Sequence, residues 1–150
     1  MLEFEEIEGT PDVDTIERLA KFYESVFGTA ELDKFEERIF AAPHLLTVVA
    51  FDCGSIVGFK IGYQIAPKKF YSWIGGVDKN FREQGIGAEL MKRQHEWCVK
   101  NGFEVVQTKT KNCFKSMLIL NLKNGFDIVE VYRDKDELRI VLEKNLSQIV

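Results

Sequence analysis

The segment covering residues 70–108 places the strongest constraint on the fold, because four elements follow one another in it without interruption. The strand-like run 70–77 leads into a glycine-containing loop, a long amphipathic helix pattern and a second strand-like run, 103–108. A helical connection between two strands of one sheet makes them parallel, with a right-handed crossover. The sequence therefore predicts one parallel strand pair, whose first strand ends at a loop and a helix N-terminus.

The loop, residues 77–88, is suited to binding an anion. The first turn of a helix has backbone N–H groups with no partner inside the helix, and the helix dipole adds a partial positive charge there. Gly85 and Gly87 lack side chains that would keep a pyrophosphate away from these groups, and Arg82 adds a planar cationic donor. We interpret residues 77–88 as a phosphate-binding loop.

The first half of the chain predicts two helices and three further strands. Residues 2–7 alternate apolar and acidic side chains, as a half-buried strand does. Pro11 suits the first position of a helix that ends at Gly28, and Thr29 is suited to cap a second helix that ends at Pro43. Residues 45–51 and 56–63 flank a turn and predict an antiparallel hairpin. The inner faces of the helices are expected to be Ile16, Leu19, Ala20, Tyr23 and Phe27, then Leu32, Phe35 and Ile39.

After residue 108, Asn112 is expected to cap a helix that ends at Gly125. Its inner face is expected to be Phe114, Met117, Leu118 and Asn121. Strands at 126–133 and 137–142 follow, joined by a polar turn. The whole chain, residues 1–150, is predicted to form a single α/β (α+β) domain, with a mixed, mostly antiparallel sheet of about six to seven strands and helices on both faces.

Composition narrows the class of protein. The chain has 150 residues with 45% hydrophobic content, enough for one core, and its net charge of −4 argues against a nucleic-acid-binding face. No apolar run approaches the roughly 18 residues of a membrane span, and the acidic N-terminus does not resemble a signal peptide. We therefore expect a soluble cytoplasmic protein with no nucleic acid or membrane partner. The three cysteines form no C-x-x-C pair and the two histidines are far apart, so no metal site is indicated.

Residues 82–87, Arg-Glu-Gln-Gly-Ile-Gly, and the order of the elements resemble the GNAT N-acetyltransferase superfamily, whose signature is Gln/Arg-x-x-Gly-x-Gly/Ala. Two further segments are similar to that family: residues 75–77 before the loop, and Asn112 with residues 120–126 after it. Three matching segments in the right order make the resemblance specific. It covers the C-terminal half of the chain and implies a GNAT fold, with a splayed parallel strand pair at the cofactor site.

The resemblance implies that acetyl-CoA is the cosubstrate and that no metal is needed. Its pyrophosphate is expected on the backbone of the phosphate-binding loop, and its pantetheine arm between the splayed strands, whose unpaired N–H and C=O groups can bind amides. A backbone N–H near Gly75 or Gly76 would stabilise the oxyanion, although the same glycines fit a β-bulge. The residues implied in cofactor binding are Gly76, Val77, Arg82, Gln84, Gly85, Ile86, Gly87, Ala88 and Asn112.

The activity implied is transfer of the acetyl group to a primary amine by direct attack, through a tetrahedral intermediate. The catalytic candidates are Tyr71, at the position where protein-lysine members of the family carry a glutamate base, and Asn121, at the position where many members carry a tyrosine acid. Asparagine cannot give up a proton, so Asn121 is expected to position the sulfur or the arm. Tyr71 is a poor base at neutral pH unless its pKa is lowered.

Other functions compete with this one. The missing tyrosine leaves open a non-catalytic acyl-CoA-binding regulatory or sensor module. A dinucleotide-binding oxidoreductase is disfavoured because Leu90 stands where the third glycine of G-x-G-x-x-G belongs, and the Gly-Lys-Ser/Thr of a P-loop is absent.

Several features stay open at the level of sequence. The acceptor, a small-molecule or peptide amine, is not specified, although the net charge weakly favours a small cationic amine. The use of longer acyl groups and a homodimer are both left open. Asn112 fits a cap and a cofactor contact equally, and His95 fits a helix-flank position better than a base.

Overall fold

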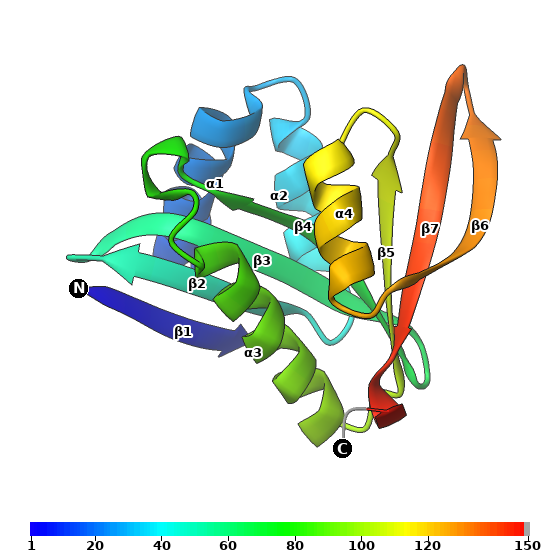
Figure 1. Ribbon diagram of the computed structural model, residues 1–150. Helices are drawn as coiled ribbons and strands as arrows, with labels where there is room; N and C mark the ends of the chain where they lie inside the picture. Colours follow the sequence, from blue (N-terminus) through cyan, green and yellow to red (C-terminus); the bar gives the residue numbers. More distant parts are fainter. Residues whose placement is uncertain (149–150) are drawn as a thin grey trace.

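Seven strands form one mixed sheet in the computed structural model, which describes residues 1–148 (Figure 1). Their order across the sheet is β1-β2-β3-β4-β5-β7-β6. The strands are β1 (Leu2–Glu8), β2 (Leu46–Asp52), β3 (Ser55–Ala66), β4 (Lys69–Val77), β5 (Val105–Lys111), β6 (Asp127–Asp134) and β7 (Glu137–Asn145). The helices are α1 (Val13–Phe27), α2 (Leu32–Ala41), α3 (Ile86–Lys100) and α4 (Lys115–Lys123), with short 3-10 helices η1 (Lys79–Phe81) and η2 (Leu146–Gln148).

The predicted fold class, a mixed and mostly antiparallel sheet with helices on both faces, is confirmed. Within residues 1–148, no helix has the length and apolar character needed to cross a membrane.

Helices cover both faces of the sheet, with α3 and α4 in front and α1 and α2 behind in Figure 1. On the α1/α2 face the helices bury Ile16, Leu19, Phe22, Tyr23, Phe35 and Ile39 against Val49, Phe59 and Ile61 of the sheet. On the α3/α4 face the core is formed by residues such as Val48, Phe70, Leu90, Trp97, Val106 and Leu142. Most residues predicted for the inner faces are buried or partly buried. Phe27 is an exception at 45% exposed, and Phe22, which was not predicted, is buried.

The predicted starts of the first two helices were each wrong by two residues. Helix α1 begins at Val13 and not at Pro11, because Asp12 is its N-cap residue and its carboxylate accepts a hydrogen bond from the Thr15 N–H at 2.8 Å. In α2 the N-cap position is Glu31, with no side-chain cap, and Thr29 contributes only its backbone carbonyl to Leu32 N–H at 3.2 Å. Side-chain hydrogen bonding therefore decided the start of α1 but not that of α2.

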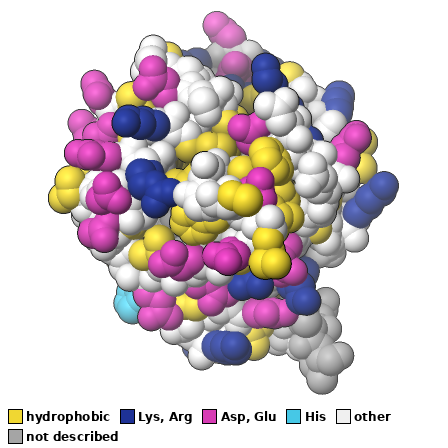
Figure 2. Space-filling model, turned by 90° about the vertical axis from the view of Figure 1, so that its left-hand side faces the viewer, with side chains coloured by type: hydrophobic (Ala, Val, Ile, Leu, Met, Phe, Trp, Pro, Cys, Tyr) yellow, Lys and Arg dark blue, Asp and Glu magenta, His cyan; other side chains and the backbone are white. Residues whose placement is uncertain are grey.

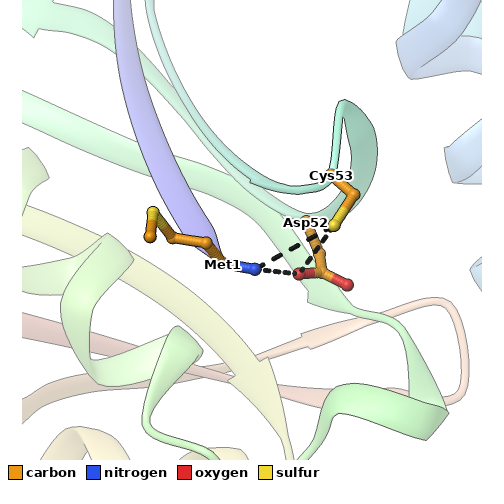
Figure 3. A network of polar contacts seen from close by, with 3 residues as sticks. All are labelled: Met1, Asp52 and Cys53. Carbon is orange, nitrogen blue, oxygen red and sulfur yellow. Dashed lines mark hydrogen bonds and ion pairs between the residues drawn. The ribbon is translucent and has the colours of Figure 1, made fainter.

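Strand β1 lies at one edge of the sheet and pairs antiparallel with β2. It is more exposed than the predicted half-buried strand, since only Phe4 and Ile7 are partly covered. The Met1 amino group lies 3.0 Å from Oδ1 of Asp52, and the Cys53 thiol lies 3.9 Å from the same oxygen (Figure 3). The hydrogen bond to Asp52 raises the pKa of this amino group. These contacts tie the start of β1 to the β2–β3 turn.

Strands β4 and β5 form the predicted parallel pair, and they pair over three residues only. The register joins Lys69 to Val105 and ends with Tyr71 opposite Gln107. Beyond this point the two strands diverge, which is visible in Figure 1 as arrows pointing in different directions. Strand β4 stays paired with β3 as far as Val77, and β5 stays paired with β7 along its whole length. We call this divergence the fork; it leaves one edge of β4 without a strand partner.

The last helix differs from its predicted inner face. Phe114 and Met117 are 53% and 42% exposed, whereas Asn121 is buried. The helix begins only at Lys115, so Phe114 is its N-cap residue and lies outside the helical repeat. The final hairpin, β6 and β7, is confirmed, with β6 at the outer edge of the sheet.

Candidate active site

The phosphate-binding loop leads from β4 through η1 to a helix start with free donors. Glu83 and Gly85 have φ of 65° and 81°, so the chain turns twice through the left-handed region before α3. Gly85 is the N-cap residue and provides no side-chain cap, while Glu89 N–H makes the first helical bond, to Gly85 O at 3.0 Å. The N–H groups of residues 86–88 therefore have no partner within the helix. This is the local geometry of an anion site.

The space in front of these donors is open. At Gly85 and Gly87, no atom lies within 4 Å of the position that a Cβ would occupy. Arg82 and Gln84 are exposed at the same loop, and Arg82 Nε donates to the Val77 carbonyl at 3.3 Å. Figure 2 views the end of the molecule that carries this loop, with hydrophobic side chains gathered near the centre and charged ones around them. The loop thus leaves room for an anionic group in front of the helix donors.

Backbone groups of β4 point into the fork in an alternating pattern. Asp78 N–H donates to Val57 O at 2.8 Å, and Gly76 is the next residue of β4 that faces β3 in the same way, opposite Phe59. The groups of Gly75 and Val77 therefore point away from β3, toward the edge that β5 has left. Of the two glycines considered as oxyanion donors, Gly75 has its N–H on the open edge.

The irregularity predicted at Gly75 or Gly76 lies elsewhere. Successive residues of β3, Ile61 and Gly62, face Ile74 and Ser72 of β4, so Trp73 is the extra residue of a β-bulge. The glycines have other reasons to lack side chains. A Cβ at Gly76 would lie 3.3 Å from a Val26 methyl group, and one at Gly75 would lie 3.0 Å from Phe59 O.

The fork is closed at its base by a side chain. Thr108 Oγ1 donates to the carbonyl oxygen of Ser72 at 3.1 Å, immediately beyond the last paired residues of β4 and β5. Sequence reasoning did not single out Thr108. Its position one residue after a parallel pair becomes meaningful only when the register is known.

The structure places Tyr71 and Asn121 on opposite faces of the sheet. Tyr71 packs edge-on against Tyr63, with ring centroids 5.5 Å apart. Burial raises the pKa of Tyr71 to about 12, the nearby Tyr63 adds to the rise, and Arg38 opposes it. The phenol is therefore protonated at neutral pH and can donate a hydrogen bond but cannot serve as a base.

Asn121 lies on α4, on the other face, and is 3% exposed. Its backbone carbonyl accepts hydrogen bonds from the N–H groups of Asn124 and Phe126, both at 3.1 Å. Among residues 1–148 its side-chain amide makes no hydrogen bond, so it is free to bind a ligand group.

Asn112 does not cap α4, contrary to the prediction. The N-cap residue is Phe114, no side chain caps the helix, and Asn112 is exposed in the preceding turn. A polar contact with a ligand remains the open interpretation of Asn112.

Sequence reasoning missed a buried polar residue of α3, His95. His95 is 5% exposed, its Nε2 is buried without a hydrogen-bond partner, and its Nδ1 lies 3.5 Å from Lys144 Nζ. Burial lowers the pKa of His95 to about 3, with Lys144 and Lys60 contributing. The helix-flank interpretation was wrong. The sequence does contain one indication of this burial. His95 follows the buried Met91 by four residues, so the two side chains lie on the same face of the helix.

Cavities lie beside α3 and beside α1. A cavity of about 640 Å³ follows one face of α3 from Ala88 to Lys100 and reaches Asn124 at the end of α4. A second, of about 400 Å³, lies between α1 and the β2–β3 turn and reaches Asp78. The larger one therefore begins at the phosphate-binding loop.

Comparison with known proteins places this geometry in a family. Residues 13–126 match the model of the acetyltransferase (GNAT) family. Among solved structures, an aminoglycoside 6'-acetyltransferase type Ii has a TM-score of 0.80 at 18% identity, covering 96% of this chain and 97% of that one. An aminoglycoside 6'-N-acetyltransferase complexed with coenzyme A has a TM-score of 0.78 at 15% identity, covering 95% and 97%.

A third structure, the PaiA N-acetyltransferase from Thermoplasma acidophilum in complex with coenzyme A, has a TM-score of 0.72 at 14% identity, covering 97% of this chain and 99% of that one. At these identities the likeness shows the fold alone. No curated protein matches the chain. The family model spans well over half of the sequence, and the chain belongs to the GNAT acetyltransferase family.

Proposed function

We propose that this protein is an N-acetyltransferase that moves an acetyl group from acetyl-CoA to a primary amine. The observation that carries the proposal is the continuity between the open edge of β4 and the unpartnered N–H groups at the start of α3. Amides of an extended arm can pair with a free strand edge, and a diphosphate suits a helix N-terminus. The coenzyme A complexes among the similar structures support this assignment.

In this proposal, the phosphate-binding loop holds the pyrophosphate, with donors from the backbone of residues 82–88. Val77 and Gly75 offer backbone groups to the arm, and Gly76 lets the strand pass close beneath α1. The thioester then lies near the base of the fork, where the Gly75 N–H is a candidate donor to the oxyanion of the tetrahedral intermediate. Asn112, exposed beside the start of α4, remains a candidate contact to the cofactor.

Proton transfer limits which amines can react quickly. Deprotonating a lysine-type amine of pKa about 10.4 near pH 7.4 costs about 4 kcal/mol, whereas an α-amine of pKa about 7.8 costs well under 1 kcal/mol. The raised pKa of Tyr71 makes it a donor and not the base. We therefore infer that the amine loses its proton to water and that amines of low pKa react fastest. Asn121 positions the sulfur through its side-chain amide.

Two measurements test the proposal together. Calorimetry measures acetyl-CoA binding, and loss of thioester absorbance measures transfer across a panel of amines. Thioester absorbance is preferable to a thiol reagent, because Cys53 and Cys113 are exposed and would react. We expect binding and amine-dependent thioester loss. Tight binding without loss for any amine would favour the alternative function, an acyl-CoA sensor.

Two variants locate the site. Gly85→Glu adds bulk and negative charge in front of the helix donors and is expected to abolish acetyl-CoA binding while the protein stays folded by circular dichroism. Asn121→Ala is expected to lower kcat about tenfold, the value of one hydrogen bond to the sulfur or the arm. The matched control is Asn124→Ala, since Asn124 Nδ2 only donates to Leu120 O at the end of the same helix. Full turnover in Asn121→Ala would remove Asn121 from the mechanism.

A further inference from the structure

We infer that the acceptor amine carries an anionic group, a carboxylate or a phosphate, which binds beside Lys109 and Arg38 on the α1/α2 face of the fork. This inference rests on the proposed acetyltransferase function and adds the class of acceptor. The phosphate-binding loop, α3 and α4 lie on the other face, so the α1/α2 face is the side from which an acceptor can approach the thioester.

Aromatic side chains line this face at the base of the fork. Tyr63 stands between Tyr71 and Trp73, with ring centroids 5.5 Å and 6.3 Å away. All three rings are only partly buried. They come from neighbouring positions of β3 and β4: Tyr71 is the last residue of β4 that pairs with β5, and Trp73 lies two residues beyond it.

Cations lie over these rings. Lys109 Nζ is 5.7 Å from the centre of the Tyr71 ring and 5.6 Å from that of Tyr132 on β6. The guanidinium of Arg38, on α2, lies 5.0 Å from the centre of the Trp73 ring. Cation–π contact holds each charge at the aromatic group without neutralising it.

Neither cation has an acidic partner. Among residues 1–148, no carboxylate oxygen lies within 4 Å of Lys109 Nζ or the Arg38 guanidinium. The positive charges of this part of the face therefore remain available to a ligand. Arg139 also acts on Tyr71, where it opposes the rise in the pKa of the phenol caused by burial, but its guanidinium already faces Asp134 at 3.7 Å and Glu137 at 3.6 Å.

The acidic groups nearby are already paired. Glu143 accepts hydrogen bonds from Lys69 at 2.7 Å and from Gln107 at 2.8 Å. Glu137 lies 2.6 Å from Lys111, and Asp134 lies 3.7 Å from Arg139. The carboxylates nearest to Gln107 and Lys111 are therefore already neutralised by lysine or arginine side chains.

The charges within the site therefore favour an anionic acceptor, whereas the net charge of the chain favours a cationic one. The chain carries −4 overall, which favours the approach of cations at long range. Within the site, the unpaired groups that would touch an acceptor are cationic, and like charges there oppose binding of a polyamine. The contacts of the bound acceptor decide specificity once encounter has occurred.

Matched pairs of amines test the inference on the full-length protein. Glycine is compared with glycinamide, and phosphoethanolamine with ethanolamine, with spermidine as the polycation, and each rate is expressed per concentration of unprotonated amine because an anionic group raises the pKa of the amine. We expect kcat/KM at least tenfold higher for the anionic member of one pair. The pair that responds identifies carboxylate or phosphate as the recognised group. Equal or higher values for the amines that lack an anionic group would overturn the inference.

Substitutions then assign the effect to one residue. Lys109→Gln is expected to raise KM for the anionic amine about tenfold, with kcat and acetyl-CoA affinity unchanged. Lys109→Glu is expected to reverse the preference, toward the cationic amine. Lys100→Gln, an exposed lysine on the other face of the sheet, is the matched control and should change neither value.

Failures of the two proposals are distinguishable. If acetyl-CoA binds and no amine of any class consumes the thioester, the acetyltransferase function itself is wrong, and the inference falls with it. If amines react but Lys109→Glu keeps the wild-type preference, the function stands and only the anionic acceptor is excluded.

Discussion

Thr108 donates a hydrogen bond from its hydroxyl to the carbonyl oxygen of Ser72 at 3.1 Å, at the point where β4 and β5 stop pairing. Ser72 is 4% exposed, so its carbonyl is shielded from solvent that could replace this donor. The bond marks the base of the fork. Its geometry therefore connects the stability of the sheet with the width of the proposed arm-binding edge.

Replacing this hydroxyl should affect both properties. Thr108→Val keeps the shape of the side chain and removes the donor, so we expect a loss of about 1 kcal/mol in the free energy of unfolding. The KM for acetyl-CoA should rise, because the strands at the base of the fork lose their link. Urea unfolding and initial rates measure the two effects. Thr108→Ser keeps the hydroxyl and should behave as wild type; if it does not, the hydrogen bond is not the cause.

Gly87→Ala separates stability from cofactor binding. A Cβ at Gly87 would meet no atom within 4 Å, and alanine in a helix is more stable than glycine by about 0.5–1 kcal/mol. We therefore expect a higher melting temperature. Acetyl-CoA affinity should nevertheless fall about tenfold or more, since the methyl group enters the space of the pyrophosphate. Glu96→Ala, at an exposed position of the same helix, serves as control. Unchanged affinity in Gly87→Ala would place the phosphates elsewhere.

Tyr71→Phe tests whether the phenol acts as a base. Because burial raises the pKa of Tyr71 to about 12, its hydroxyl stays protonated throughout the neutral range. We expect kcat to fall less than tenfold, as for one lost hydrogen bond, and the acid limb of the pH–rate profile to stay in place. Rates of the wild type and variant between about pH 6 and 9 measure this. Disappearance of the acid limb in the variant would identify Tyr71 as the base after all.

His95 should make stability depend on pH. Burial lowers the pKa of His95 to about 3, below the value of about 6.5 in an unfolded chain. Its contribution to stability is therefore present above pH 6.5 and is lost as pH falls toward 3, by about 1.4 kcal/mol per pH unit, because the unfolded state alone takes up the proton. In His95→Gln the unfolding free energy should fall less steeply over this range.

Urea unfolding at several pH values between about 7 and 4 gives the two slopes. The difference between wild type and variant is the relevant quantity, since carboxylates contribute to both. His44→Gln is the control, because His44 is exposed in the α2–β2 connection. Parallel curves for wild type and His95→Gln would mean that His95 is not held neutral in the folded protein.

The sequence by itself determined the order of the elements and the position of the phosphate-binding loop. These features rest on local physics: the periodicity of apolar residues around residues 86–98, the stop at Gly102 and the absence of side chains at Gly85 and Gly87. Each depends on residues within a few positions of one another. The element order, together with the same glycines, was also sufficient to indicate the family.

Only the tertiary structure decided which groups face the fork. Register assigned the open edge to Gly75, moved the bulge to Trp73 and gave Thr108 its role. Burial of His95, and the meeting of Arg38 and Lys109 at the fork, bring together residues far apart in the chain. Long-range pairing and packing determine such contacts, and no local pattern records them. The phosphate-binding loop was therefore predictable from sequence, whereas the proposed acceptor site required the packed sheet.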